Sequence, residues 1–176
     1  MNLVGKVNNI IKKGKLIRKN DRVLIGCSGG IDSTALLFVL VEISKETPFE
    51  TGIAHINHQL RGQESERDEN FVRMLAKRFS LPCHINKIDV AGYAKKHGIS
   101  VQHAGRNIRY DYFDKVADRY GYNRIAIAHN MDDQVETFIL RLLKGTGLRG
   151  LGSIPVKRDR IIRPFLGISR QEIEKY

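Results

Sequence analysis

Apolar residues along the chain follow two alternating patterns. Short continuous apolar runs, typical of buried strands, occur at 22–27, 50–57, 82–88, 124–129 and 160–165. Between them, apolar residues recur every three or four positions, as one face of a helix requires. That spacing predicts helices at 4–11, 33–44, 65–79, 90–98, 100–121 and 132–144, with another beginning after Gly167. No internal repeat interrupts this alternation.

Strands that alternate with helices predict an α/β fold, because a parallel strand pair needs a crossover helix. We therefore expect a doubly wound, mostly parallel, five-stranded Rossmann-like sheet with helices on both faces. Residues 1–21 read as a basic helical segment that precedes the α/β domain, which we place at 22–176.

Three of the predicted strands end in unusually polar or glycine-rich segments. They are SGGIDS at 28–33, HINHQLRG at 55–62 and AHNMDDQVET at 128–137. In doubly wound sheets, ligands bind at the carboxyl ends of the strands, where the connections diverge. The sequence therefore predicts one site assembled from three loops on the same edge of the sheet.

The composition narrows the setting. The chain has 176 residues, 41% of them hydrophobic, which is ordinary for a globular domain. No apolar run approaches the ~20 residues that span a bilayer, so we expect no membrane partner. The first residues lack a signal-peptide core. Two cysteines, Cys27 and Cys83, form neither a CxxC motif nor a disulfide framework, so the predicted location is the cytoplasm.

The net charge of +11 is unevenly distributed. Residues 1–22 hold seven Lys or Arg and one acid, residues 144–176 hold eight and three, and the middle of the chain is balanced. Such ends could form a basic rim that attracts a polyanion, with an affinity that falls as salt rises. A lysine-rich solubilising surface explains the charge equally well.

The segment 28–33 has the chemistry of a phosphate-binding loop. It joins a buried strand to a helix N-terminus, where backbone N–H groups and the helix dipole attract anions. Gly29 and Gly30 permit close approach, Ser28 and Ser33 carry hydroxyls, and Asp32 could hold Mg²⁺. The segment matches neither a Walker A motif nor GxGxxG. The alternative is an ordinary tight turn with Asp32 near a helix start.

This loop resembles the SGGxDS pyrophosphate loop of the N-type ATP pyrophosphatases, which transfer AMP from ATP to an oxygen of a substrate. Further segments resemble, in order, the HxNHxLR, GRxxRY, AHxxDDQxET, RLxxGTGxxGL and IRPLL-type motifs of tRNA(Ile)-lysidine synthetases. In this chain they lie at 55–61, 105–110, 128–137, 141–151 and 162–166. The resemblance covers nearly the whole chain.

The resemblance implies a ligase that uses ATP and Mg²⁺. It would adenylate O2 of the wobble cytidine in a CAU-anticodon tRNA(Ile), and L-lysine would then displace AMP to leave lysidine. Family members continue into a C-terminal tRNA-binding region, which we expect and which this chain lacks. The oligomeric state is not readable from the sequence, and a homodimer stays open.

The same resemblance suggests roles for individual residues. The predicted catalytic residues are Asp32, Arg109, Asp133 and Glu136, with Asp32 also on the metal. The last two, three apart on one helix face, would also bind lysine. The predicted ATP contacts are Ser28, Gly29, Gly30, Ile31, Asp32, Ser33, His55 and Asn57. The predicted substrate or tRNA contacts are His58, Arg61, Arg106, His129, Gly145, Thr146 and Gly147.

Alternatives remain at each of these positions. Asp133 and Glu136 could simply stabilise their helix N-terminus, worth ~0.3–1 kcal/mol. Arg109 could form a surface ion pair with Asp111 or Asp114. His58 and His129 are equal candidates for a general base. The rival functions are a tRNA 2-thiocytidine synthetase, disfavoured because its CxxC cysteines are missing, and a nucleotide-binding module without catalysis.

Overall fold

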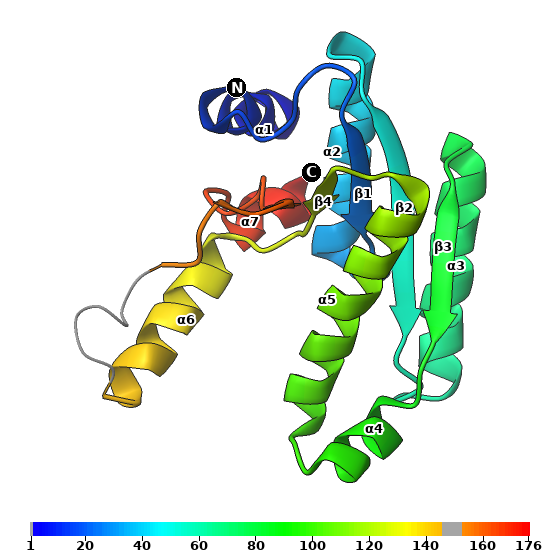
Figure 1. Ribbon diagram of the computed structural model, residues 1–176. Helices are drawn as coiled ribbons and strands as arrows, with labels where there is room; N and C mark the ends of the chain where they lie inside the picture. The colour runs from blue at the N-terminus through cyan, green and yellow to red at the C-terminus, as the bar shows by residue number, and fades with distance from the viewer. Residues whose placement is uncertain (1, 146–152) are drawn as a thin grey trace.

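The computed structural model describes residues 2–145 and 153–176, which form one six-stranded sheet with helices packed on it (Figure 1). The strands are β1 (Arg22–Gly26), β2 (Glu50–Asn57), β3 (Cys83–Lys87), β4 (Arg124–Ala126), β5 (Lys157–Arg158) and β6 (Ile161–Ile162). The helices are α1 (Leu3–Gly14), α2 (Ile31–Glu46), α3 (Gln63–Phe79), α4 (Val90–His97), α5 (Val101–Tyr120), α6 (Met131–Leu143) and α7 (Arg170–Lys175).

The strand order is β3-β2-β1-β4-β6-β5, and every pair is parallel except β5 with β6. After β1 the chain builds outward through β2 and β3, then returns to place β4 on the other side of β1. The connections therefore diverge between β1 and β4. Crevices form at such a switch point, at the carboxyl ends of the strands.

The predicted α/β class, parallel pairing and helices on both faces are confirmed, but the strand count of five is wrong. The predicted strand at 160–165 shortens to β6, because Pro164 has no N–H to continue a ladder. The chain before it adds β5, paired antiparallel to β6 across a turn in which Asp159 has φ +54°. Both residues of β5 are exposed and charged, so no apolar pattern marked this strand.

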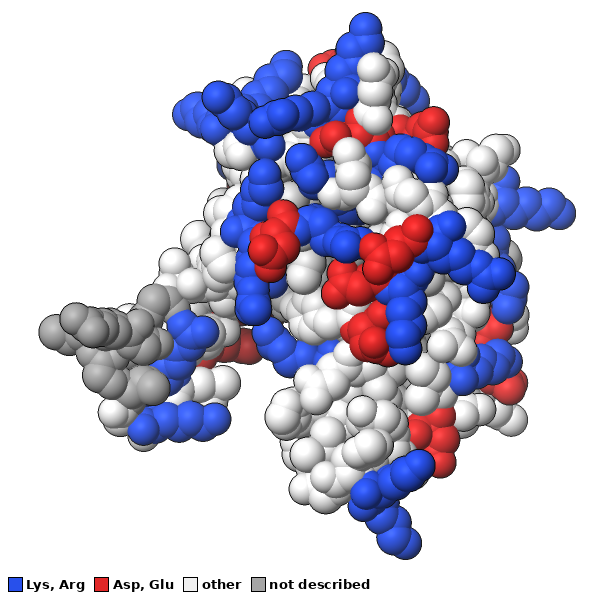
Figure 2. Space-filling model, in the orientation of Figure 1, with Lys and Arg blue, Asp and Glu red and all other residues white. Residues whose placement is uncertain are grey.

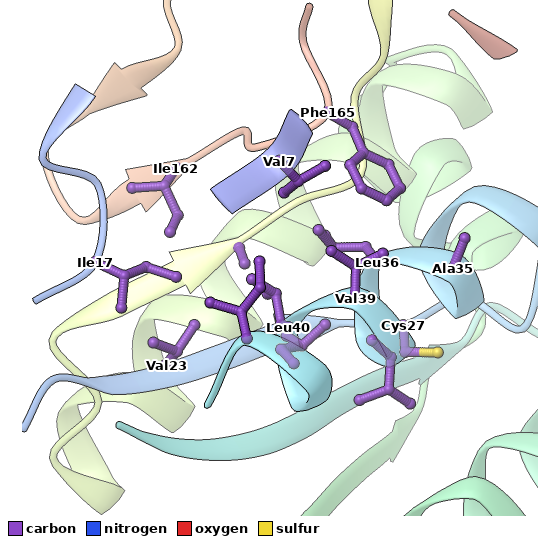
Figure 3. Packing of buried hydrophobic residues seen from close by; sticks show 14 of the residues in the cluster. Val7, Ile17, Val23, Cys27, Ala35, Leu36, Val39, Leu40, Ile162 and Phe165 are labelled. Carbon is purple, nitrogen blue, oxygen red and sulfur yellow. The ribbon is translucent and has the colours of Figure 1, made fainter. Parts of the chain in front are cut away.

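The strands of this sheet bury side chains on both faces. Val23 and Ile25 of β1 belong to one cluster, with side chains from α1, α2, α3 and α7, whereas Leu24 joins a second cluster with α4 and α5. Figure 3 shows part of the first cluster, with Val7 of α1 and Phe165 near Leu36 of α2. This two-sided core holds the strand ends at fixed positions.

Helix α6 differs from the others because none of its residues is buried. It extends away from the sheet in Figure 1, and its apolar side chains face solvent, Leu140 being 56% exposed. Its N-terminus is nevertheless fixed to the body, since the N–H of Met131 donates to the carbonyl of Ile168 at 2.9 Å. Within the part of the chain that the structure describes, no helix is long and apolar enough to cross a membrane.

The two basic ends of the chain meet in the fold. Lys6 of α1 forms an ion pair with Glu172 of α7, and both helices pack on α2. In the view of Figure 2, Lys and Arg side chains crowd the upper left, over α1 and the segment that follows it, while acids are interspersed over the centre. This surface suits a polyanion, whose binding stays a prediction.

Replacing Leu36 by Ala should lower the free energy of unfolding by about 2–5 kcal/mol, because this fully buried side chain leaves a cavity. Leu140→Ala is the matched control and should change stability by less than about 0.5 kcal/mol, since its side chain is already in water. Urea unfolding followed by circular dichroism measures both. Equal losses in the two variants would contradict this assignment of the core.

Candidate active site

A cleft of about 330 Å³ opens at the carboxyl ends of β1, β2 and β4. The exit of β1 contributes Cys27, Ser28, Asp32 and Ser33, the exit of β2 contributes residues 55–58, and the exit of β4 contributes 127–129. The three polar strand exits thus meet at one place, as the sequence predicts. Side chains from α3 and α5, including Asp68 and Arg109, complete the wall.

The loop between β1 and α2 leaves a helix N-terminus open toward this cleft. Gly30 is the N-cap of α2 and makes no side-chain capping bond; α3, which begins after Gly62, lacks one too, whereas the other five helices all begin with one. The N–H groups of the first helical turn therefore stay available to a ligand. With the helix dipole they favour an anion such as phosphate. Ile31, the first helical residue, is itself exposed.

Ser33 stabilises the loop from inside. Its buried hydroxyl accepts from the Ser28 N–H at 3.1 Å and donates to the Gly30 carbonyl at 3.0 Å. Its oxygen also lies 3.1 Å from that of Ser28. The Ser33 hydroxyl is thus used within the loop, and Ser28 is the hydroxyl nearer to solvent. A direct contact from Ser33 to ATP stays a prediction.

Both the backbone conformation at position 29 and the close approach of a neighbouring helix require a glycine there. Its φ of +92° is a conformation that side chains disfavour, and a Cβ there would lie 3.1 Å from the Cβ of Asp68 on α3. Close packing of α3 against the loop therefore depends on this glycine. Asp68 itself pairs with Arg61 at 3.2 Å across the cleft wall.

Asp32 lies in the first turn of α2, and only one of its two carboxylate oxygens has a partner among the described residues. Its Oδ2 lies 3.4 Å from Nη1 of Arg170 on α7, while its buried Oδ1 has no hydrogen-bond partner among the described residues. Burial raises the pKa of Asp32, Arg170 lowers it, and the nearby Asp133 raises it.

An unpartnered carboxylate oxygen beside a phosphate-type loop fits Mg²⁺, which binds through one or two carboxylates together with phosphate oxygens and water. Within residues 2–145 and 153–176 no cluster of three or more His, Cys, Asp or Glu exists, so these side chains alone make no complete cation cage. Asp32 is the residue that would hold the ion.

His55 and Asn57 of β2 are both buried in the cleft wall but differ in what they leave free. Nδ1 of His55 lies 2.8 Å from the Cys27 carbonyl and donates to it, and its buried Nε2 has no partner among the described residues. The amide of Asn57 is occupied: it donates to the Ser65 carbonyl and to Glu69, and accepts from the Gln59 N–H. Asn57 therefore shapes the loop, and its contact with ATP stays a prediction.

Arg109 of α5 reaches the cleft, but the two acids considered as its partners bond elsewhere. Asp111 pairs with Lys115 at 2.8 Å and Asp114 with Arg160 at 3.6 Å. Among the described residues no acid lies within ion-pair distance of Arg109. Its guanidinium is therefore available to phosphate, as the functional hypothesis requires.

A second hollow lies between α5 and the exit of β2. Its lining includes Arg106, Arg109 and His58. The guanidinium of Arg106 lies over the ring of Tyr110 at 5.4 Å. His58 borders both hollows, and its buried Nδ1 has no partner within the described structure. Burial, Arg109 and His55 lower the pKa of His58.

His129 follows β4 and lines the main cleft. Its Nδ1 accepts a hydrogen bond from Nε of the buried Arg163 at 3.1 Å. Burial lowers the pKa of His129 to about 4, Arg163 lowers it too, and Asp133 opposes them. The ring is therefore neutral at pH 7, and its Nδ1 is engaged, whereas Nδ1 of His58 has no partner among the described residues.

The predicted lysine pair is placed beside the cleft rather than in its wall. Asp133 closes a capping box, its Oδ2 accepting the Asn130 N–H at 2.8 Å, so the helix-stabilising role is realised. It still lies near enough to Asp32 and His129 to shift both pKa values. Glu136 is exposed one turn further along α6. Gly145, with φ +66°, follows α6, and Thr146 and Gly147 lie outside the described residues.

The sequence analysis missed three charged residues of this site. Asp68 packs on the loop glycine, Arg170 pairs with Asp32, and Arg163 bonds His129. Arg163 does fall inside a motif segment, 162–166, which was the one available signal. Asp68 and Arg170 lie in amphipathic helices where a charged residue normally marks only the solvent face.

The family model described as "PP-loop domain" matches residues 1–176. The chain belongs to the PP-loop domain family. Its glycine loop at 28–33, with the uncapped α2 behind it, is the structural feature that accords with this membership.

This PP-loop domain is also similar to longer curated proteins named tRNA(Ile)-lysidine synthase. The Clostridium tetani protein is 42% identical over 99% of this chain, which spans 38% of that relative. The Petrotoga mobilis protein is 42% identical over 97% of this chain, which spans 55% of it. The chain thus covers between about two fifths and just over half of these relatives.

Two solved structures share the fold. The U34-tRNA thiolase NcsA from Methanococcus maripaludis, with its [4Fe-4S] cluster, aligns with a TM-score of 0.74 at 18% identity, covering 97% of this chain and 60% of that one. The NH3-dependent NAD synthetase from Campylobacter jejuni aligns with a TM-score of 0.58 at 20% identity, covering 97% and 68%. At these identities the likeness concerns the fold alone.

Gly29→Ala should lower the free energy of unfolding by about 2 kcal/mol and weaken ATP binding, because it combines a disfavoured φ with crowding against Asp68. Gly30→Ala is the control: its φ is −75° and its nearest neighbour lies at 3.5 Å, so the loss should stay within about 1 kcal/mol. Urea unfolding and calorimetric ATP titration test the pair. The idea fails if the two variants are equally affected.

The depressed pKa of His129 predicts that acid destabilises the fold. The unfolded chain binds a proton near pH 6.5 that folded His129 accepts only near pH 4, so stability falls as the pH drops through this interval. His129→Gln should remove about 1 kcal/mol of the loss between pH 7 and pH 5, allowing for partial exposure. Urea midpoints at the two pH values measure it. An unchanged pH dependence in the variant would rule out this origin.

Proposed function

We propose that this PP-loop domain binds ATP and Mg²⁺ and catalyses the ligation of L-lysine to C2 of the wobble cytidine in a CAU-anticodon tRNA(Ile). The observation that carries the proposal is the uncapped N-terminus of α2, which opens into the same cleft as Arg109, a guanidinium with no acid within ion-pair distance in the described part of the chain. Membership of the PP-loop family and the names of the relatives support the choice of ATP and of lysidine formation.

In the first step, O2 of the cytidine attacks the α-phosphorus of ATP, the bond to the β-phosphate oxygen breaks, and pyrophosphate leaves. The N–H groups of the first turn of α2 hold the departing phosphates, and Arg109 stabilises charge that develops on the phosphoryl oxygens. Asp32 would hold a Mg²⁺ ion, which would supply neutralisation of the phosphate charge. The product is a cytidine whose former carbonyl oxygen has become a good leaving group.

In the second step, a lysine amine attacks C2, and the C2–O bond breaks to release AMP. The attacking amine must first be neutral, although its ordinary pKa is about 10.4. Asp133 and Glu136 lie on one face of α6 beside the cleft and would bind an amino group of lysine, with one carboxylate free to accept a proton. Which of the two amines attacks stays open.

The basic ends of the chain would attract the tRNA backbone, although the charge gathered near α1 lies toward the amino ends of the strands, away from the cleft. Beside the cleft itself, Arg106 and His58 are the groups that would contact the RNA. The proposal includes selection of the tRNA by a further region, as the resemblance implies, and a cytoplasmic location, as the cysteine usage predicts.

A tRNA thiolase is disfavoured by the cysteines. The chain has only Cys27 and Cys83; Cys27 is buried, and burial raises the pKa of its thiol. Cluster ligands must be accessible thiolates, commonly four in number. A module that binds ATP without turnover is the second alternative. Among the described residues, Arg109 has no acid within ion-pair distance and one carboxylate oxygen of Asp32 has no partner, and both observations speak for catalysis.

With α-labelled ATP, Mg²⁺, lysine and CAU-anticodon tRNA(Ile), we expect AMP release that requires both tRNA and lysine, and lysine joined to the wobble cytidine. Arg109→Ala should slow AMP formation by about 100-fold, as loss of a donor to a charged transition state does. Arg119→Ala, on the same helix but outside the cleft, should stay within about twofold. Thin-layer chromatography and nucleoside mass spectrometry give the readouts.

A tRNA with uridine at the wobble position is the substrate control and should give no product. AMP formation that needs a sulfur donor instead of lysine would establish the thiolase. ATP binding without AMP formation under every substrate combination would leave the binding module as the function.

A further inference from the structure

The hydrogen bond between Arg163 and His129 determines which ring nitrogen of the histidine carries a proton. An arginine side chain has only donors and remains charged, so the atom facing it must be an acceptor. Nε of Arg163 donates to Nδ1 of His129 at 3.1 Å. Nδ1 therefore has a free lone pair, and in the neutral ring the proton is on Nε2.

Arg163 is held rigidly enough to impose this choice. Its side chain is 4% exposed, and its Nη1 donates to the Pro155 carbonyl at 2.8 Å. Its own N–H donates to the Val156 carbonyl at 2.8 Å, just before β5. The segment 155–163, which includes the β5–β6 hairpin, thus fixes the guanidinium from two sides.

We propose that Arg163 is a positioning residue, which fixes His129 as a neutral hydrogen-bond donor with Nε2–H in the nucleotide cleft. The inference rests on the proposed function for the identity of the ligand. It assigns His129 the role of donor to a phosphate or phosphoryl oxygen and removes it as a candidate general base. A neutral His55 has the opposite tautomer, because its Nδ1–H donates to the carbonyl of Cys27.

The charges around His129 favour the same state. Arg163 comes from the segment after β6, and Arg106 and Arg109 come from α5; all three lower the pKa of His129, with Asp133 of α6 opposing them. A proton added to Nδ1 would also break the bond to Arg163 and place two donors face to face. The cleft therefore offers an anion a donor that does not titrate near neutral pH.

The tautomer can be observed directly. In long-range ¹H–¹⁵N spectra of the full chain with ¹⁵N-labelled histidine at pH 7, His129 should show a bare Nδ1 and a protonated Nε2. In Arg163→Met a mixture containing Nδ1–H should appear. Assignment uses the His129→Gln spectrum, from which the signal is missing. A protonated Nδ1 in the unaltered protein overturns the proposal, whether or not ATP binds.

A double-mutant cycle separates positioning from a merely structural role. His129→Phe and Arg163→Met should each weaken binding of a non-hydrolysable ATP analogue by about tenfold, the effect of one lost hydrogen bond to a charged group. The double variant should lose no more than either single one. His129→Gln, which places an amide donor near the position of Nε2, should bind more tightly than His129→Phe.

If the loss of affinity in the double variant equals the product of the two single losses, Arg163 acts independently of His129. That result would overturn the proposal. Arg163→Lys keeps the charge and tests whether the fork geometry is needed; we expect it to behave like Arg163→Met, because a buried ammonium cannot make both bonds. Failure of the unaltered chain to bind the analogue at all would instead contradict the proposed function, and the spectra would still decide the tautomer.

Discussion

The candidate site depends on one constraint, that the first turn of α2 must keep its N–H groups free while its loop stays ordered. Most helices of this domain satisfy those groups with a capping side chain, and α2 does not. The hydroxyl of Ser33 compensates by bonding the backbone on both sides of the turn from within. Gly29 then lets Asp68 of α3 pack against the same loop. An anion site of this kind is stabilised by its neighbours and not by its own ligand.

The surrounding charges show the same division between groups that hold the scaffold and groups left for a ligand. Asn57 and Arg163 have their hydrogen-bonding capacity engaged by nearby backbone or side chains, and one carboxylate oxygen of Asp133 caps its own helix. Among the described residues the buried Oδ1 of Asp32 and Nε2 of His55 lack hydrogen-bond partners, and the exposed Arg109 has no acid within ion-pair distance. Burying polar atoms without partners costs free energy, which a protein retains where function requires it. These three groups line one cleft.

Much of this arrangement could be predicted because it depends on local patterns. Apolar runs located β1, β2 and β4, and the polar residues after each run identified the edge where they meet. Strand β6 could be predicted within 160–165, but β5, which pairs with it, could not be, since the pairing of exposed charged residues leaves no apolar signal. The sequence also does not show whether a polar side chain already has its hydrogen-bond partners. Asn57 is predicted as a ligand contact, but in the structure its amide donates to Glu69. Arg170 reaches Asp32 only through the packing of α7 on α2.

The hairpin also affects how the sheet ends. A strand at the edge of a sheet presents unpaired N–H and C=O groups on which another chain can add a strand, which is a common beginning of aggregation. Here β5 forms that edge with only two residues, Lys157 and Arg158, both charged and exposed. An incoming chain could pair with only two residues of this edge. If it were a second copy of this domain, the positive charges of the two edge strands would also repel each other. This short charged strand thus protects the domain from self-association along that edge of the sheet.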